Sequence, residues 1–243
     1  MIQFFRKIRQ EYFTQNRFGK YFVYAIGEIL LVVIGILIAV AINNRNEQKK
    51  LDAQLETYRT SLTEELGQDI VNLNKSKDDL LRKRESIFNY VDYYNTKNPE
   101  ANVLLQKMEV INWSKSAFYT NTYTIEDLIT TGNLSLFPKQ EKQAILKLKN
   151  IQERYFTYET QTIENSALYD LELKKNIDLL FFKGYSAKQH PTVLKWKDDL
   201  DSKQFRTLNN TFAESLTLYD FQEDLYIRLI EDTQLLLELI KQH

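Results

Sequence analysis

The chain contains no cysteine among its 243 residues, and it has only six glycines, three prolines and two histidines. The lack of cysteine excludes disulfides, thiolate metal sites and cysteine nucleophiles. Glycine and proline usually make up about 7% and 5% of a protein, so the residues of tight turns are scarce here. A fold of many short strands needs such turns, and we therefore expect long helices. The net charge of −1 gives no general reason to expect nucleic acid as a partner, and we predict none.

Motifs for nucleotide binding, hydrolysis and zinc are also missing, since the sequence contains no GxGxxG, P-loop, GxSxG or HExxH. A metal site built on His190 or His243 would need carboxylate partners. The nearest cluster is Asp198, Asp199 and Asp201, which is more simply the solvated acidic end of a helix. We predict no catalytic residue, no metal site and no cofactor, and we expect that the protein is not an enzyme.

The chain does contain one long apolar run, from Tyr21 to Asn43, with Glu28 as its single ionisable residue. As a helix this run is about 33 Å long, enough to cross a hydrocarbon core of about 30 Å. The sequence therefore predicts three parts. Residues 1–20 form a cytoplasmic, amphipathic and basic segment, residues 21–43 a transmembrane helix, and residues 44–243 an extracytoplasmic, all-helical domain.

The segment before the apolar run has two interpretations. On a helical wheel its aromatic and aliphatic side chains separate from its cations, which is typical of a helix lying at the membrane surface. Alternatively, it is only a basic flank that fixes the orientation of the span. The candidate surface residues are Phe4, Phe5, Arg6, Lys7, Ile8 and Arg9.

The distribution of positive charge favours an N-terminus inside, although only slightly. Five Lys or Arg residues precede the run, and four lie within the first stretch after it. Cleavage as a signal peptide is the competing interpretation, because Ala39-Val40-Ala41 resembles a cleavage site. The run is about 22 residues long, however, and a signal-peptide apolar region has 7–15.

Small and polar residues recur along one side of the predicted span at steps of three and four. They predict a face for contact with another helix, because small side chains allow close approach in lipid. The alternative is that the carboxylate of Glu28 snorkels toward the headgroups. The residues of this predicted contact face are Ala25, Glu28, Val32, Gly35 and Ala39.

Several segments resemble the start of a family of uncharacterised single-span bacterial membrane proteins. They read FFRKIR, KY, YAIGEI, LVVIGILIA and INNRNE, at Phe4–Arg9, Lys20–Tyr21, Tyr24–Ile29, Leu31–Ala39 and Ile42–Glu47. A second block, Tyr123–Leu148, is similar to a weaker family pattern at Leu128, Gly132, Leu134 and Leu136.

The resemblance implies an uncleaved anchor in a Gram-negative bacterium, and it carries no activity. The chain departs from the pattern at Arg45, where relatives often have Trp. The expected location is the bacterial inner membrane, crossed once, with the N-terminus cytoplasmic and the C-terminal domain periplasmic.

Helical periodicity dominates the rest of the chain. We predict helices over residues 47–95, 99–111, 124–131, from Pro138 to about 184, and from Ser202 onward. Asn98, Ser202 and the pair Thr124/Asp127 are the predicted N-terminal caps, and Gly132 the predicted left-handed C-cap. In the first helix, consecutive four-residue steps at Leu62, Leu66 and Ile70 predict a break in any heptad. The fold class is therefore all-α, a transmembrane helix followed by a long-helix bundle or coiled coil.

Aromatic residues are abundant, with 15 Tyr and 14 Phe. Some of them could line a recognition surface, or they could fill wide gaps between helices. These residues are Tyr90, Tyr93, Tyr94, Tyr119, Tyr123, Tyr155, Phe156 and Tyr158.

Two classes of function remain open. The first is a membrane-anchored interaction or scaffold protein, whose partners are the lipid bilayer and either further copies of itself or a membrane or periplasmic protein. The second is an accessory subunit of an inner-membrane complex, in which Glu28 takes part in ion or proton handling or in helix assembly. A ligand-sensing bundle is a third and weaker possibility, because no second apolar span follows to carry a signal.

Overall fold

The structure is a computed structural model that describes residues 17–178, 180, 185 and 195–242. Within these residues all regular secondary structure is helical, which confirms the predicted all-α class. The chain divides into two compact units, Met1–Thr57 and Tyr58–His243. The predicted membrane-surface residues, Phe4 to Arg9, lie outside the described part of the chain.

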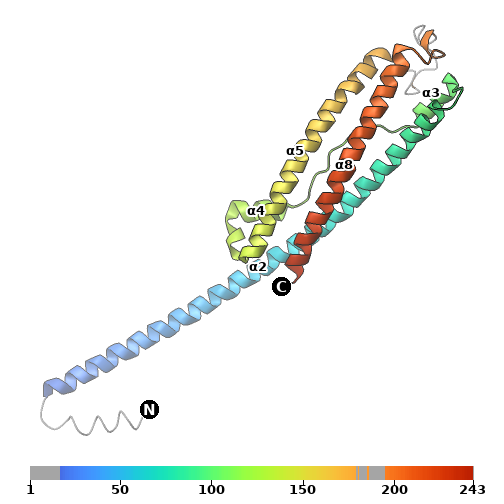
Figure 1. The fold of residues 1–243 in the computed structure, drawn as a ribbon. Helices are drawn as coiled ribbons and strands as arrows, with labels where there is room; N and C mark the ends of the chain where they lie inside the picture. The colour runs from blue at the N-terminus through green and yellow to red at the C-terminus, as the bar shows by residue number, and fades with distance from the viewer. Residues whose placement is uncertain (1–16, 179, 181–184, 186–194, 243) are drawn as a thin grey trace. The chain divides into compact units, whose positions relative to one another are not determined.

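Within the described residues, three long helices and three short ones follow one another (Figure 1). The first, α2, runs without a break over the predicted span and the predicted 47–95 helix. The elements are α2 (Arg17–Tyr94), α3 (Ala101–Glu109), α4 (Tyr123–Thr131), the 3₁₀ helix η1 (Asn133–Leu136), α5 (Lys139–Asn176) and α8 (Lys203–Lys241).

The part of α2 that belongs to the second unit buries a regular heptad seam, so the predicted break is wrong. Asp69 is 1% exposed and takes the core position, whereas Ile70 is only half-buried. Alternating steps of four and three are what two helices need to keep one seam in contact. The seam consists of Leu62, Leu66, Asp69, Leu73, Ser76, Leu80, Lys83, Ile87 and Tyr90.

Helices α5 and α8 pack as an antiparallel pair, because residues near the start of α5 contact residues near the end of α8. Lys147 of α5 reaches Asp232 of α8 (3.4 Å), and Glu172, near the end of α5, reaches Lys203 (3.4 Å). The predicted apolar stripe of α5 is correct for Ile145, Leu148 and Ile151. It is wrong for Tyr158 and Tyr169, which are exposed.

Polar residues occupy the buried stripe of α5 where those tyrosines were expected. Gln152, Glu159 and Ser166 are buried there at steps of seven residues, and Glu141 is buried nearer the start of α5. Helix α5 also ends at Asn176, earlier than predicted. The core of the second unit is therefore a mixed polar and apolar one.

Helix α8 also runs antiparallel to α2. The Arg84 guanidinium pairs with Asp220 (3.0 Å) and Glu223 (2.7 Å). Further along α2, Tyr90 packs edge-on against Phe212, with ring centroids 4.9 Å apart, and its hydroxyl donates to Asn209 (2.8 Å).

Two of the predicted helix caps are correct and two are wrong. Ser202 Oγ accepts the backbone N–H of Phe205 (3.3 Å), and Gly132 ends α4 with a φ of 78°. Asn98 is not a cap, because α3 begins at Ala101 and its N-cap is Glu100. The predicted capping box fails because Thr124 already lies inside α4.

Candidate functional site

Between α3 and α4, residues 111–122 form an extended segment, which we call the strap (Figure 1). Its burial alternates along the chain, with Ile111 and Trp113 turned inward and Asn112 and Ser114 exposed. It contacts α2, α5 and α8. An extended chain next to helices cannot complete a backbone ladder, so its N–H and C=O groups need side-chain partners.

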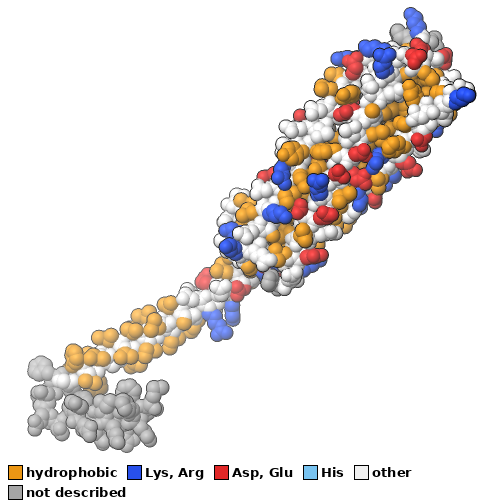
Figure 2. Space-filling view, viewed as in Figure 1, with side chains coloured by type: hydrophobic (Ala, Val, Ile, Leu, Met, Phe, Trp, Pro, Cys, Tyr) orange, Lys and Arg blue, Asp and Glu red, His pale blue; other side chains and the backbone are white. Residues whose placement is uncertain are grey.

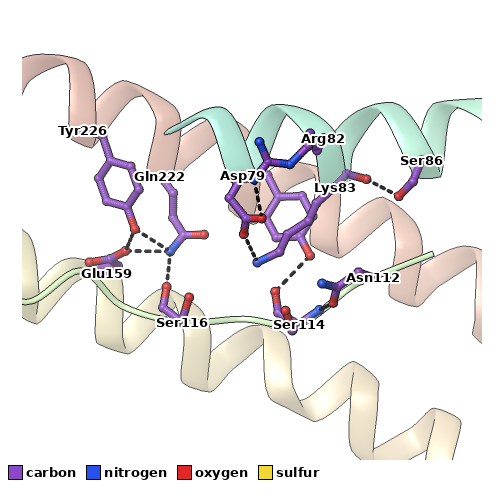
Figure 3. A network of polar contacts seen from close by, with 11 residues as sticks. Asp79, Arg82, Lys83, Ser86, Asn112, Ser114, Ser116, Glu159, Gln222 and Tyr226 are labelled. Carbon is purple, nitrogen blue, oxygen red and sulfur yellow. Dashed lines mark hydrogen bonds and ion pairs between the residues drawn. The ribbon is translucent and has the colours of Figure 1, made fainter. Parts of the chain in front are cut away.

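Glu159 of α5 is at the centre of the polar contacts to the strap (Figure 3). One of its carboxylate oxygens accepts the backbone N–H of Phe118 (3.0 Å). The other accepts the Tyr226 hydroxyl (2.5 Å) and Gln222 Nε2 (2.6 Å), both from α8. Glu159 is 3% exposed, and among the described residues no Lys or Arg is within ion-pair distance of it.

Other side chains hold the strap's carbonyl groups. Gln222 Nε2 donates to the carbonyl of Ser116 (2.8 Å), as Figure 3 shows. The Tyr219 hydroxyl donates to the carbonyl of Ser114 (3.2 Å). The ammonium group of Lys115, in the strap, forms an ion pair with Asp170 of α5 (2.8 Å). These contacts tie one extended segment to both helices of the α5–α8 pair.

Helix α2 supplies two further carboxylates. Asp69 Oδ1 accepts both the backbone N–H (2.8 Å) and the side-chain amide (3.1 Å) of Asn121. Glu65 accepts the backbone N–H (3.0 Å) and hydroxyl (2.8 Å) of Thr124. Glu65 therefore caps the first turn of α4 from another helix, which is the role that the predicted capping box gave to local residues.

Burial controls the protonation of the central acids. Loss of hydration raises the pKa of Glu159 above its ordinary value, and the hydrogen bonds from Tyr226 and Gln222 oppose this only in part. Burial likewise raises the pKa of Asp69. By contrast, the hydrogen bond from Lys83 holds the pKa of Asp79 below its usual value.

A cavity of about 330 Å³ adjoins the strap. This volume lies at the lower end of the range of small-molecule sites. The strap contributes aromatic side chains, α5 contributes Lys149, Gln152, Glu153 and Glu159, and α4 contributes Glu126. Glu159 and Tyr226 form part of its lining, so the cavity and the carboxylate network are one site.

One group in the lining lacks a partner. Gln152 is 6% exposed, and its Oε1 accepts the Thr122 hydroxyl (3.2 Å). Its Nε2 donor makes no hydrogen bond to any described residue. The Nε2 atom is itself buried, so it is an unsatisfied group of the core and is not open to the cavity.

The predicted contact face of the span lies on the first part of α2. Every side chain from residue 21 to 43 is exposed in this structure, and Figure 2 shows the apolar surface that results. A Cβ added to Gly35 would meet no atom within 4 Å. Contact with another helix through Ala25, Glu28, Val32, Gly35 and Ala39 stays a prediction.

Sequence reasoning missed the polar members of the site: Asp69, Gln152, Glu159 and Gln222. They were missed because only apolar residues were counted as core. Two signals were available. The heptad of α2 continues when Asp69 is admitted, and Ile111, Trp113 and Ala117 alternate as in a strand buried on one side. Of the aromatic candidates, Tyr119, Tyr123, Tyr155 and Phe156 line the cavity, whereas Tyr90 is core.

Comparison with known proteins gives one match. A family of unknown function (DUF6090) matches residues 28–180, which is more than half of the chain, and the chain belongs to that family. The match includes the second resembling block, Tyr123–Leu148, which extends from α4 through η1 into α5. No curated protein matches the chain. No solved structure matches it either.

Proposed function

We propose that this protein is a single-span membrane protein that presents a helical interaction domain outside the cytoplasm. One observation carries the proposal. The first part of α2 is long and apolar enough to cross a membrane by length and composition, and none of its apolar surface is buried. Apolar area of that extent is unstable in water, and a hydrocarbon core would cover it.

The second unit supports the role of an interaction domain. Its long helices are joined by specific buried polar contacts, which favour one packing register over others. Exposed apolar residues remain on its surface, among them Phe88 of α2 and Leu168 and Leu171 of α5. Leu168 and Leu171 lie one turn apart on the same face of α5, and neighbouring exposed apolar residues support a role in binding another protein.

Two measurements test the proposal. Native membranes are washed with alkaline carbonate, which removes peripheral proteins, and the chain should remain in the membrane. A reporter that is active only in the periplasm, fused after His243, should be active. Release by carbonate would contradict the anchor, and an active cytoplasmic reporter at the same fusion point would contradict the orientation.

A third measurement tests the interaction role. The chain is purified from native membranes in a mild detergent, and the proteins that accompany it are identified and quantified. Recovery in a fixed ratio with itself or with a membrane or periplasmic protein supports the proposal. Recovery as a monomer without a stoichiometric companion would contradict it.

A further inference from the structure

The cavity beside the strap has a consistent chemical character. Aromatic side chains from the strap and from α5 form much of its wall, namely Phe118, Tyr119, Tyr155 and Phe156. Tyr119 is 71% exposed and Phe156 is 39% exposed, although the centroids of their rings are 5.1 Å apart. Paired rings left open at the edge of a cavity present π faces to whatever enters it.

The charges of the lining favour a cation. Its ionisable groups, tyrosines aside, are Glu126, Glu153, Glu159 and Lys149. Three carboxylates against one ammonium give a formal charge of −2. Lys149 is already paired with Glu126 (2.8 Å) and Glu153 (3.3 Å), whereas Glu159 has hydrogen-bond donors but no cation within ion-pair distance among the described residues. An anionic ligand would meet an excess of negative charge here.

We propose that this cavity binds a small organic cation such as a quaternary ammonium group. The positive group lies against the rings of Tyr119 and Phe156, in the field of the lining carboxylates. A volume of about 330 Å³ accommodates such a molecule. The same chemistry occurs in free quaternary ammonium ions and in lipid headgroups. The inference is independent of the membrane role proposed above.

The test uses the full chain in a maltoside detergent, which has no cationic headgroup, and isothermal titration calorimetry with choline. Choline is compared with 3,3-dimethylbutan-1-ol, which has the same shape and hydroxyl but no charge. We expect choline to bind at least about tenfold more tightly, because cation–π and carboxylate attraction act on the charge alone. Equal affinity of the two, or no saturable binding of choline below about 10 mM, would overturn the proposal.

Two further ligands separate the contributions. Tetramethylammonium keeps the charge and lacks the hydroxyl, and it should bind within about threefold of choline, because the charge is the group that the rings recognise. Glycerophosphocholine carries the same cation with the phosphate of a lipid headgroup. It should bind more weakly, because its phosphate meets the acidic lining. Equal or tighter binding would support the cation site with a lipid headgroup as the source.

Variants assign the effect to this cavity. Phe156→Leu removes one of the two rings against which the positive group lies, and it should weaken both cations about threefold or more. Tyr158→Leu, on the same helix but outside the cavity lining, is the matched control and should change neither affinity. Equal losses in Phe156→Leu and Tyr158→Leu would overturn the assignment to this cavity.

Discussion

The Tyr226 hydroxyl of α8 donates to the buried carboxylate of Glu159 on α5 at 2.5 Å. The same carboxylate accepts the backbone N–H of Phe118, so a single side chain joins α8, α5 and the strap. The distance is in the range of hydrogen bonds to an ionised acceptor. No cation neutralises this carboxylate among the described residues, and its hydrogen bonds therefore provide its stabilisation.

Removal of the Tyr226 hydroxyl should destabilise the second unit. Tyr226→Phe should lower the free energy of unfolding by about 1–3 kcal/mol, because it removes one donor from a buried carboxylate. The measurement is urea unfolding of the full chain in detergent, followed by circular dichroism. Tyr158→Phe, on exposed α5 surface, is the control and should leave the midpoint unchanged. Equal midpoints for the two variants would show that the bond contributes little.

Stability should depend on pH through Glu159. Burial raises its folded-state pKa above the ordinary value of 4.5, so the folded state holds the proton more tightly than the unfolded state. The resulting stabilisation is fully present below pH 4.5 and is lost as the pH rises through the folded-state pKa. Burial also raises the pKa of Asp69, so Asp69 adds a further loss of stability as the pH rises.

Glu159→Gln should therefore flatten the dependence of unfolding free energy on pH above about 4.5, whatever its effect on absolute stability. The control is Glu153→Gln at an exposed position of the same helix, which should leave the slope as in the unmodified chain. If Glu159→Gln keeps the original slope, this residue is not the titrating group.

The Arg59–Glu141 pair should be important for joining α2 to α5. The guanidinium binds both carboxylate oxygens, at 2.7 and 3.2 Å, and Glu141 is 1% exposed. Glu141→Gln or Arg59→Met alone should cost about 1.5–3 kcal/mol, because each removes charge-assisted hydrogen bonds at a buried carboxylate. The double variant should cost less than the sum of the two. The exposed pair Lys50–Glu47 is the control, and its disruption should have no measurable effect. Additive single effects would contradict the coupling.

Glu65 should be required for the start of α4. Glu65→Ala leaves the Thr124 backbone N–H without its acceptor and should cost about 0.5–2 kcal/mol, as for loss of a helix cap. Hydrogen exchange should become faster in the first turn of α4. Glu64→Ala, at the neighbouring exposed position, is the control. Unchanged protection in Glu65→Ala would show that the cap is dispensable.

The predicted contact face of the span can be tested separately. Gly35→Leu together with Glu28→Ala should abolish self-association in a membrane-helix oligomerisation assay, because it removes the small residue and the polar group from one stripe. Ile34→Leu with Leu37→Ala, on other faces of the helix, should leave association intact. If both pairs behave alike, Glu28 serves only to reach the headgroups, and ion handling by this residue loses its basis.

Particular residues show how far sequence reasoning reaches. Gly132 and Ser202 were correctly predicted as cap residues, because both signals are local: a glycine after a helical stripe and a serine before one. Asp69 and Ile70 show the limit. The hydrophobic pattern selected Ile70 for the core, whereas the partner available to Asp69, the Asn121 amides of the strap, made the polar residue the buried one. That partner is 52 residues away in the sequence.

The sequence by itself determined the features that depend on local composition and periodicity. These are the all-α class, the apolar run at Tyr21–Asn43, the end of α2 and the start of α8. The tertiary structure alone decided that residues 111–122 lie extended between helices, that Glu159 becomes their central acceptor, and that a cavity forms beside them. The physical reason is that a buried polar group is stable only when a partner meets it. Which partners meet depends on how distant segments pack, and periodicity within one helix carries no information about that.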